Sequence, residues 1–115
     1  MGTSGGIVRR LGMAVVRGRS MTPTLREDDR LLVLHGGRPR AGRLAVVRFA
    51  DGVVAVKRLD HHATDGWWVV RDNVFEGRDS WSAGAIAEDG VLAVVLVRLW
   101  PQPGRIPGPP EPVGR

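Results

Sequence analysis

The sequence predicts an all-β fold, either a small barrel or a folded sheet, and three observations lead to that prediction. Short runs rich in Val and Leu recur along the chain, each about as long as a strand and bounded by Gly, Pro or Asp. Gly-Gly and Asp-Gly pairs, which are typical of tight turns, stand between several of these runs. No stretch carries a long pattern of helical period. The predicted strands cover residues 13–16, 30–35, 43–49, 53–59, 67–71 and 91–100.

Each predicted strand has its own support. The first run, MAVV, is short and apolar, and the second, RLLVLH, ends at a Gly-Gly pair at residues 36–37. The third and fourth runs, RLAVVRF and VVAVKRL, are separated by Asp51-Gly52, a good hairpin signal. Turn pairs at residues 65–66 and 89–90 precede the fifth run, WWVVR, and the last, VLAVVLVRLW.

Length and composition predict one folded domain between two flexible ends. The chain has 115 residues, which suits a single modest core, and 43% of them are hydrophobic. Residues 1–11 are expected to form a flexible lead. From residue 101 the chain reads PQPGRIPGPPEPVGR, which is rich in Pro and Gly and is expected to be disordered to residue 115. The folded domain is therefore expected to span residues 12–100.

Charge and cysteine content exclude several classes of function. The chain has no cysteine, which excludes disulfides and thiolate chemistry and fits a reducing compartment such as the cytoplasm. Its net charge of +5 comes from scattered arginines, and no nucleic-acid fingerprint accompanies them. The most apolar run, residues 91–100, contains Arg98 and is shorter than the roughly 20 residues that span a bilayer. No segment has signal-peptide character. We expect a cytoplasmic protein, with membrane contact limited to a surface.

The single lysine of the chain, Lys57, is a candidate general base. Side chains alternate between faces along a strand, so Lys57 shares its face with Ala55 and Leu59. A lysine in such an apolar row either extends to the edge and stays charged or is buried and loses its proton more readily. A base that works near pH 7 requires the second arrangement.

Ser20 lies in the stretch RGRSMTPTL and is a candidate nucleophile. Pro23 fixes its own φ angle and favours an extended Thr22, while Gly18 allows close backbone approach. This corner could hold the serine rigidly, although the same pattern is common in ordinary turns. A third polar stretch, RDNVFEGRDSW at residues 71–81, reads alone as a loop.

Together, in this order and spacing, the three stretches resemble the signal peptidase family of Ser/Lys proteases. The resemblance covers residues 16 to about 88 and implies a small signal-peptidase-like β fold and serine endopeptidase activity without a metal or other cofactor. By this resemblance Ser20 is the nucleophile, and its amide and that of Gly18 lie where the oxyanion forms. Lys57 is the base. The residues that frame the site are Arg58, Asp72, Asn73, Asp79 and Ser80.

Within that family the chain is most similar to the maturation proteases of nickel-type superoxide dismutase. The phrases VVRGRSMTPTL, VAVKR, GWWVVRDN, DSW and VLAVVLVRLWP carry this similarity. The implied function is removal of the N-terminal propeptide from the dismutase precursor. The protein partner is then that precursor, and no nucleic acid is involved.

Three positions depart from the family pattern. Gly18 stands where a hydroxyl residue often helps to bind the oxyanion, which leaves backbone donors, chiefly the Ser20 amide. Gly77 stands where a serine often supports the lysine, and Trp81 where an arginine often pairs with the aspartate. We expect Arg58 or Arg78 to pair with Asp79 instead.

Other readings use the same residues differently. His35, His61 or His62 could complete a Ser-His-Asp triad with Ser20. The segment DHHATDG, residues 60–66, could hold a metal, although adjacent histidines on a strand point apart and a solvated turn is the simpler interpretation. Three further alternatives are a basic β-barrel binding module, a peptidase that acts on precursors at a membrane face, and self-cleavage. The last is disfavoured because only 19 residues precede the serine.

Overall fold

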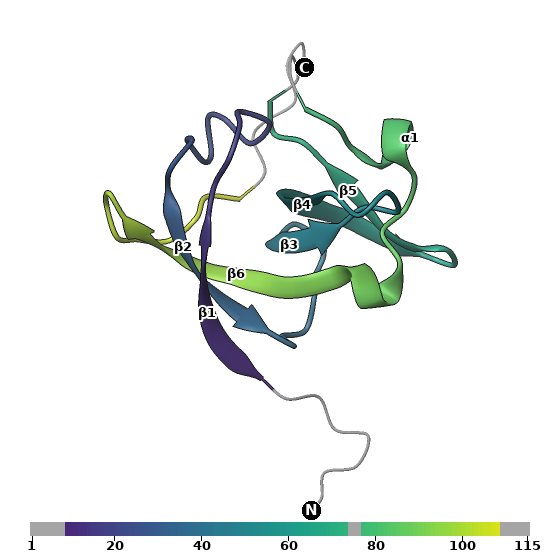
Figure 1. Cartoon of the computed structure of the whole chain (residues 1–115), viewed down its shortest axis with the longest axis horizontal. Helices are drawn as coiled ribbons and strands as arrows, with labels where there is room; N and C mark the ends of the chain where they lie inside the picture. Colours follow the sequence, from purple (N-terminus) through teal and green to yellow (C-terminus); the bar gives the residue numbers. More distant parts are fainter. Residues whose placement is uncertain (1–8, 74–76, 109–115) are drawn as a thin grey trace, which may run out of the picture.

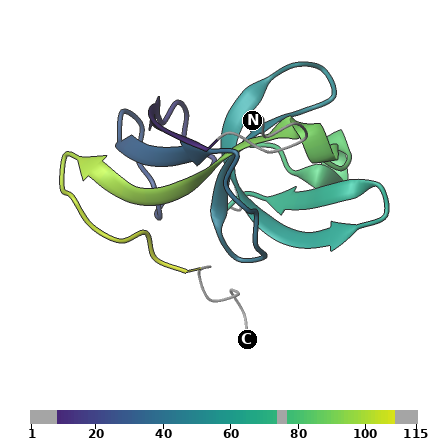
Figure 2. The ribbon, with the colours of Figure 1, turned by 90° about the horizontal axis from the view of Figure 1, so that it is seen from below.

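The computed structural model describes residues 9–73 and 77–108 and confirms the all-β prediction. Six strands form one open sheet in the order β1-β2-β6-β3-β4-β5, and all neighbouring strands are antiparallel (Figure 1). Seen from below, the strongly curved sheet divides into one part built on β1, β2 and the end of β6 and another built on β3, β4 and β5 (Figure 2). The strands are β1 (Arg10–Val15), β2 (Arg30–His35), β3 (Leu44–Arg48), β4 (Val54–Ala63), β5 (Gly66–Val70) and β6 (Val91–Trp100).

Two core clusters lie on opposite faces of the central strands. The first contains Leu31 and Val33 of β2 and Val56 of β4, together with residues of the turn that follows β1. The second contains Leu59 of β4 and the buried aromatic side chains of Phe49 and Trp67. Because the curved sheet covers both faces of β4, consecutive residues of this strand are buried. The predicted alternation holds, since Ala55 and Leu59 pack in the second cluster and Val56 packs in the first.

Several element boundaries differ from the sequence predictions. The first strand begins at Arg10, inside the expected lead. β4 continues to Ala63, so that most of the segment at residues 60–66 is strand rather than turn. In its pairing with β5, His61 lies opposite Trp68 and His62 opposite Trp67. Packing between such cross-strand pairs stabilises the longer strand. Two short helices, α1 (Ser80–Ala83) and the 3₁₀ helix η1 (Glu88–Gly90), were not predicted.

The C-terminal segment also differs from its prediction. Residues 101–108 fold back onto the domain. The Gly104 amide donates to the Arg98 carbonyl, and the Arg98 amide donates to the Gly104 carbonyl. Ile106 packs against the first core cluster. The folded part therefore extends beyond residue 100, because a single apolar side chain anchors this Pro-rich stretch. Residues 1–8, 74–76 and 109–115 lie outside the described residues.

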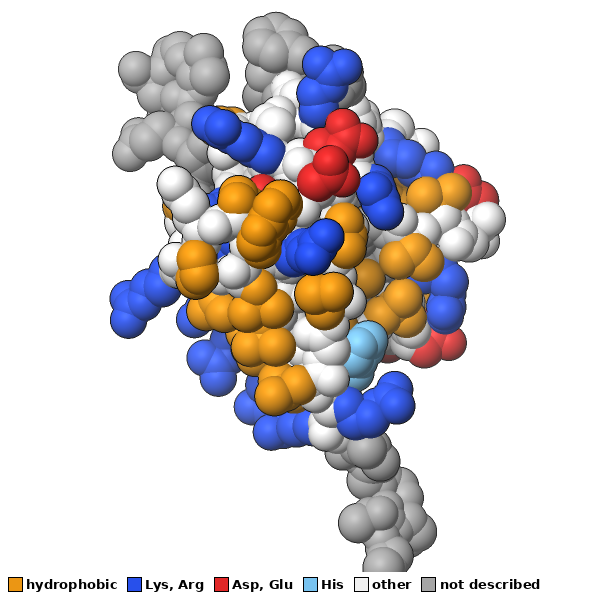
Figure 3. Space-filling view, turned by 60° about the vertical axis from the view of Figure 1, so that its left-hand side comes forward, with side chains coloured by type: hydrophobic (Ala, Val, Ile, Leu, Met, Phe, Trp, Pro, Cys, Tyr) orange, Lys and Arg blue, Asp and Glu red, His pale blue; other side chains and the backbone are white. Residues whose placement is uncertain are grey.

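The outer face of β1, β2 and the end of β6 is apolar and exposed. By strand register Leu11 lies opposite Leu34, and Met13 lies opposite Leu32, which in turn lies opposite Val97. Leu11 and Met13 are exposed to 66% and 58%. In the space-filling view orange side chains gather there with blue, basic side chains around them, which are arginines because the single lysine is buried (Figure 3). We call this surface the β1–β2–β6 patch; its members are Leu11, Met13, Leu32, Leu34, Val97 and Leu99. No helix among the described residues is long and apolar enough to cross a membrane.

Candidate active site

The turn after β1 presents Ser20 at its surface. Met21 and Leu25, on either side of Pro23, are almost fully buried in the first core cluster, and the Leu25 amide donates to the Met21 carbonyl at 2.8 Å. The Thr22 hydroxyl donates to the carbonyl of Arg19 at 2.8 Å. Two apolar anchors and local hydrogen bonds thus fix the backbone on the C-terminal side of Ser20.

Lys57 lies within hydrogen-bonding distance of this serine. Its Nζ and the Ser20 Oγ are 2.8 Å apart, although the two residues are 37 positions apart in the chain. Lys57 is only 2% exposed and lies opposite Ala45 of β3. Of the two arrangements that the sequence leaves open for this lysine, the structure shows the buried one.

Burial lowers the pKa of Lys57 from 10.5 to about 8, because an ammonium ion loses its hydration in this environment. The nearby carboxylate of Asp79 opposes this effect and raises the pKa, while the cationic side chains of Arg71 and Arg78 lower it further. A substantial fraction of the lysine is therefore neutral near pH 7–8, as a general base requires.

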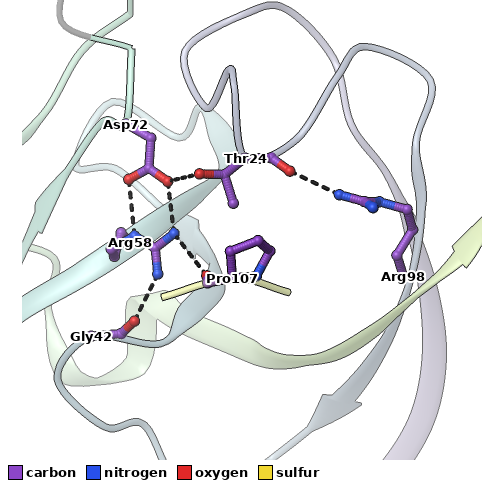
Figure 4. Close-up of polar contacts among 6 residues, drawn as sticks. All are labelled: Thr24, Gly42, Arg58, Asp72, Arg98 and Pro107. Carbon is purple, nitrogen blue, oxygen red and sulfur yellow. Dashed lines mark hydrogen bonds and ion pairs between the residues drawn. The ribbon is translucent and has the colours of Figure 1, made fainter. Parts of the chain in front are cut away.

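A buried ion pair lies on the face of β4 opposite to the lysine. Arg58 follows Lys57 on β4, and its Nε and Nη2 donate to the two carboxylate oxygens of Asp72 at 2.9 and 2.7 Å (Figure 4). Both side chains are at most 3% exposed. The Thr24 hydroxyl also donates to Asp72 (Figure 4). Since Thr24 belongs to the turn that carries Ser20, the pair ties that turn to the strand that carries the lysine.

Asn73 supports the serine directly. Its backbone amide donates to the Ser20 carbonyl at 2.8 Å, and its side-chain amide donates to the Arg19 carbonyl at 2.8 Å and to the Thr22 hydroxyl at 3.0 Å. The expected framing residues Asp72 and Asn73 therefore lie at the site.

Gly77 approaches Ser20 more closely than any side chain could. A Cβ atom built on Gly77 would lie 2.2 Å from the Ser20 Cβ, and its φ of +100° also favours glycine. From the sequence alone this glycine is only a departure from the family pattern. Its spacing from the Asp-Asn pair was the one available sequence signal that it belongs to the site. The need for glycine follows from the close approach of its backbone to Ser20, which only the structure shows.

Asp79 and Ser80 also make structural hydrogen bonds. The Asp79 carboxylate accepts from the Ser82 amide and caps α1, while the buried Ser80 hydroxyl accepts from the Val69 amide at 2.8 Å. The expected pairing of Asp79 with Arg58 or Arg78 is wrong. Arg58 pairs with Asp72 and Arg78 with Asp51, because those carboxylates lie within reach of the two guanidinium groups.

A cleft opens beside the serine and the lysine. Its volume is about 330 Å³, and Ser20 and Lys57 lie on its wall with Gly77. Its other lining residues are Arg17, Gly18, Arg19, Phe49, Val53, Val54, Ala55 and Arg78. β4 pairs with β3 from Val54 onward but with β5 only from Arg58 onward, so that among the described residues no strand covers the second edge of residues 54–57.

The positions of Gly18 and the Ser20 amide bear on oxyanion binding. Gly18 has a φ of +77°, and its amide donates weakly to Glu27 at 3.4 Å. No hydrogen bond within the described part of the chain uses the Ser20 amide. A backbone donor next to the serine oxygen therefore remains accessible.

The histidines lie elsewhere. His61 contacts Asp60 at 2.7 Å and stacks on Trp68, and His62 contacts Glu88. Residues 9–73 and 77–108 contain no group of three or more metal-ligating side chains that could hold an ion. The group that lies against the Ser20 hydroxyl is the amine of Lys57, not an imidazole.

The structure thus places a serine hydroxyl in contact with a buried lysine on a small β domain. A family model described as Peptidase S24-like matches residues 7–77, more than half of the chain and a range that includes both side chains. The chain therefore belongs to the S24-like peptidase family, whose activity is of the serine peptidase type. Comparisons with curated proteins and with solved structures find no match.

Proposed function

We propose that this protein is a serine endopeptidase in which Ser20 is the nucleophile and Lys57 the general base. The observation that carries the proposal is the 2.8 Å contact between Lys57 Nζ and Ser20 Oγ, made by a buried amine whose pKa is lowered to about 8. Burial of the charged Lys57 amine destabilises the protein. A catalytic role, in which the neutral amine accepts a proton, explains why the protein retains this destabilising residue.

The reaction follows from the positions of these two groups. Neutral Lys57 takes the hydroxyl proton of Ser20 as Oγ attacks the peptide carbonyl, and the Ser20 amide donates to the developing oxyanion. The C–N bond then breaks, the lysine returns its proton to the leaving amine, and an ester to Ser20 remains. A water molecule attacks this ester while Lys57 takes a proton from the water. The bond between the acyl carbon and Ser20 Oγ then breaks, Lys57 returns the proton to Oγ, and the carboxylic acid product leaves.

The exposed edge of β4 offers a way to bind a substrate. A peptide in extended conformation can add to a free strand edge through main-chain hydrogen bonds. Val54, Ala55 and Lys57 of this edge line the cleft, so a peptide bound there passes the serine. We infer that the substrate is an extended, unfolded segment of a protein rather than a folded surface.

We further propose that the substrate is the precursor of a nickel-type superoxide dismutase, cut in the cytoplasm to remove its N-terminal propeptide. The support for this substrate is the similarity of the stretches around Ser20, Lys57 and Asp72 to the maturation proteases of that enzyme. The test mixes the purified protein with the precursor and determines the N-terminus of the product. Wild type and Ser82→Ala, a matched surface serine, should cut at one bond, whereas Ser20→Ala and Lys57→Met should not. Cleavage by Ser20→Ala would show that the nucleophile is wrong.

A second candidate function is the processing of other precursors at a membrane face, and the β1–β2–β6 patch favours it. Exposed aliphatic side chains with arginines around them suit the interface of a bilayer that carries anionic lipids. Sedimentation with vesicles of phosphatidylcholine and phosphatidylglycerol tests this candidate. Binding that the double variant Leu11→Ser, Met13→Ser loses, and that Leu96→Ser retains, would favour the membrane role. Equal behaviour of all three proteins would exclude it.

A further inference from the structure

The C-terminal strap, which we define as residues 104–108, reaches the ion pair beside the active site. The chain turns after β6, and Gly104 forms two backbone hydrogen bonds with Arg98 at 2.8 and 3.0 Å. Ile106 then packs against the first core cluster. The carbonyl of Pro107 accepts from Arg58 Nη2 at 3.3 Å (Figure 4). A segment of Pro-rich composition is thus attached at three successive points, and the last of them is a buried guanidinium.

The contact is one of four hydrogen bonds that Arg58 donates. Its Nε and Nη2 engage Asp72, and its Nη1 donates to the Gly42 carbonyl at 2.8 Å. The strap therefore contacts a cation that is almost fully buried. An ion pair that stays out of water keeps a fixed geometry, whereas hydration weakens it and lets both side chains move.

The geometry of this ion pair bears on both reacting groups. Arg58 is adjacent to Lys57 in β4, and Asp72 binds the Thr24 hydroxyl of the turn that presents Ser20. The residue after Asp72, Asn73, donates to the Ser20 carbonyl. A small shift of the pair would therefore separate the lysine from the serine, and displacements of about 1 Å at reacting atoms can reduce rates about 100-fold.

We propose that the C-terminal strap is a positioning element of the peptidase: by closing the Arg58–Asp72 pair from solvent, it keeps the lysine and serine within bonding distance. This inference rests on the proposed function. The strap contributes no residue to the cleft that holds Ser20 and Lys57. Its removal should therefore lower kcat and leave KM almost unchanged, which separates positioning from substrate binding.

The test compares a chain that ends at residue 103 with a control chain that ends at residue 108. The control should match wild type. The shorter chain should show a kcat lower by roughly 10- to 100-fold, a KM within about twofold of wild type, and a shifted pKa of Lys57 because the amine loses its fixed contact with Ser20. The variant Ile106→Ser in the full chain loosens the same contact without truncation, and it should change the three quantities in the same directions.

The pKa is read from the ¹³Cε resonance of the single lysine, which needs no substrate. A folded short chain with wild-type kcat and an unchanged Lys57 titration overturns the proposal, as does a loss of thermal stability alone in Ile106→Ser. If the wild type cuts no dismutase precursor, the substrate assignment fails, but the titration still decides whether the strap positions the lysine.

Discussion

Replacing Lys57 by methionine should make the protein more stable at neutral pH. The lysine pKa falls from 10.5 in the unfolded chain to about 8 in the folded protein, which at roughly 1.4 kcal/mol per pH unit corresponds to about 3 kcal/mol. Methionine keeps the apolar stem but loses the hydrogen bond to Ser20, which contributes about 1 kcal/mol. The expected net gain at pH 7 is therefore about 2 kcal/mol in the free energy of unfolding.

The gain in stability of Lys57→Met over wild type should decrease as the pH rises. Between pH 8 and 10.5 the unfolded wild type binds more protons than the folded wild type, so its stability rises with pH in that window. The advantage of the methionine variant is thus complete below about pH 8, shrinks through the window, and is lost above pH 10.5. The chain has no tyrosine and no cysteine, so among its side chains Lys57 alone titrates there.

Urea unfolding of both proteins at pH 7 and at pH 11 measures the difference. Arg43→Met, at an exposed position, is the matched control, and it should change stability by less than about 0.5 kcal/mol at either pH. If the methionine variant is less stable than wild type at pH 7, or if the gap is the same at both pH values, the lysine is not a destabilised buried amine.

Three further predictions concern catalysis and packing. The kcat/KM for precursor cleavage should rise with pH to a plateau, with a midpoint near pH 8, because only neutral Lys57 accepts a proton; a profile that is flat from pH 6 to 10 would contradict this. Gly77→Ala should reduce cleavage at least about tenfold because its methyl group meets Ser20, whereas Gly84→Ala, also at positive φ but in open space, should retain activity. Arg58→Met should lower the free energy of unfolding by roughly 3–5 kcal/mol in urea titrations, since it leaves a buried carboxylate unpaired; a loss below about 1 kcal/mol would count against the ion pair.

The strands were predictable because their physical signals are local. Val-rich and Leu-rich runs bounded by turn residues mark all six strands, and the hairpin at Asp51-Gly52 joins β3 to β4. The alternation along β4 also placed Lys57 in an apolar row. The burial of Arg58 on the opposite face was not predictable from one strand, since it depends on a sheet that curves until both faces of β4 are covered.

The site itself was predictable only in part. The resemblance pointed to Ser20 and Lys57, and the structure brings their side chains into contact. The expected pairing of Asp79 with an arginine was wrong, because Arg58 and Arg78 reach Asp72 and Asp51 instead, and Asp79 caps the short helix α1. The strap was not predicted either. The Pro and Gly content of residues 101–108 indicates disorder, and Ile106 is the one aliphatic side chain there that anchors the segment.

The most direct test of the account is the titration of Lys57 in the wild-type protein. With ¹³C-labelled lysine the protein gives a single Cε resonance, whose shift follows the protonation of one amine. We predict a midpoint near pH 8 that shifts measurably in Ser20→Ala, because the amine then loses its hydrogen-bond partner. A midpoint near 10.5, the same in both proteins, would show that the amine is solvated and distant from the serine, and would contradict the account.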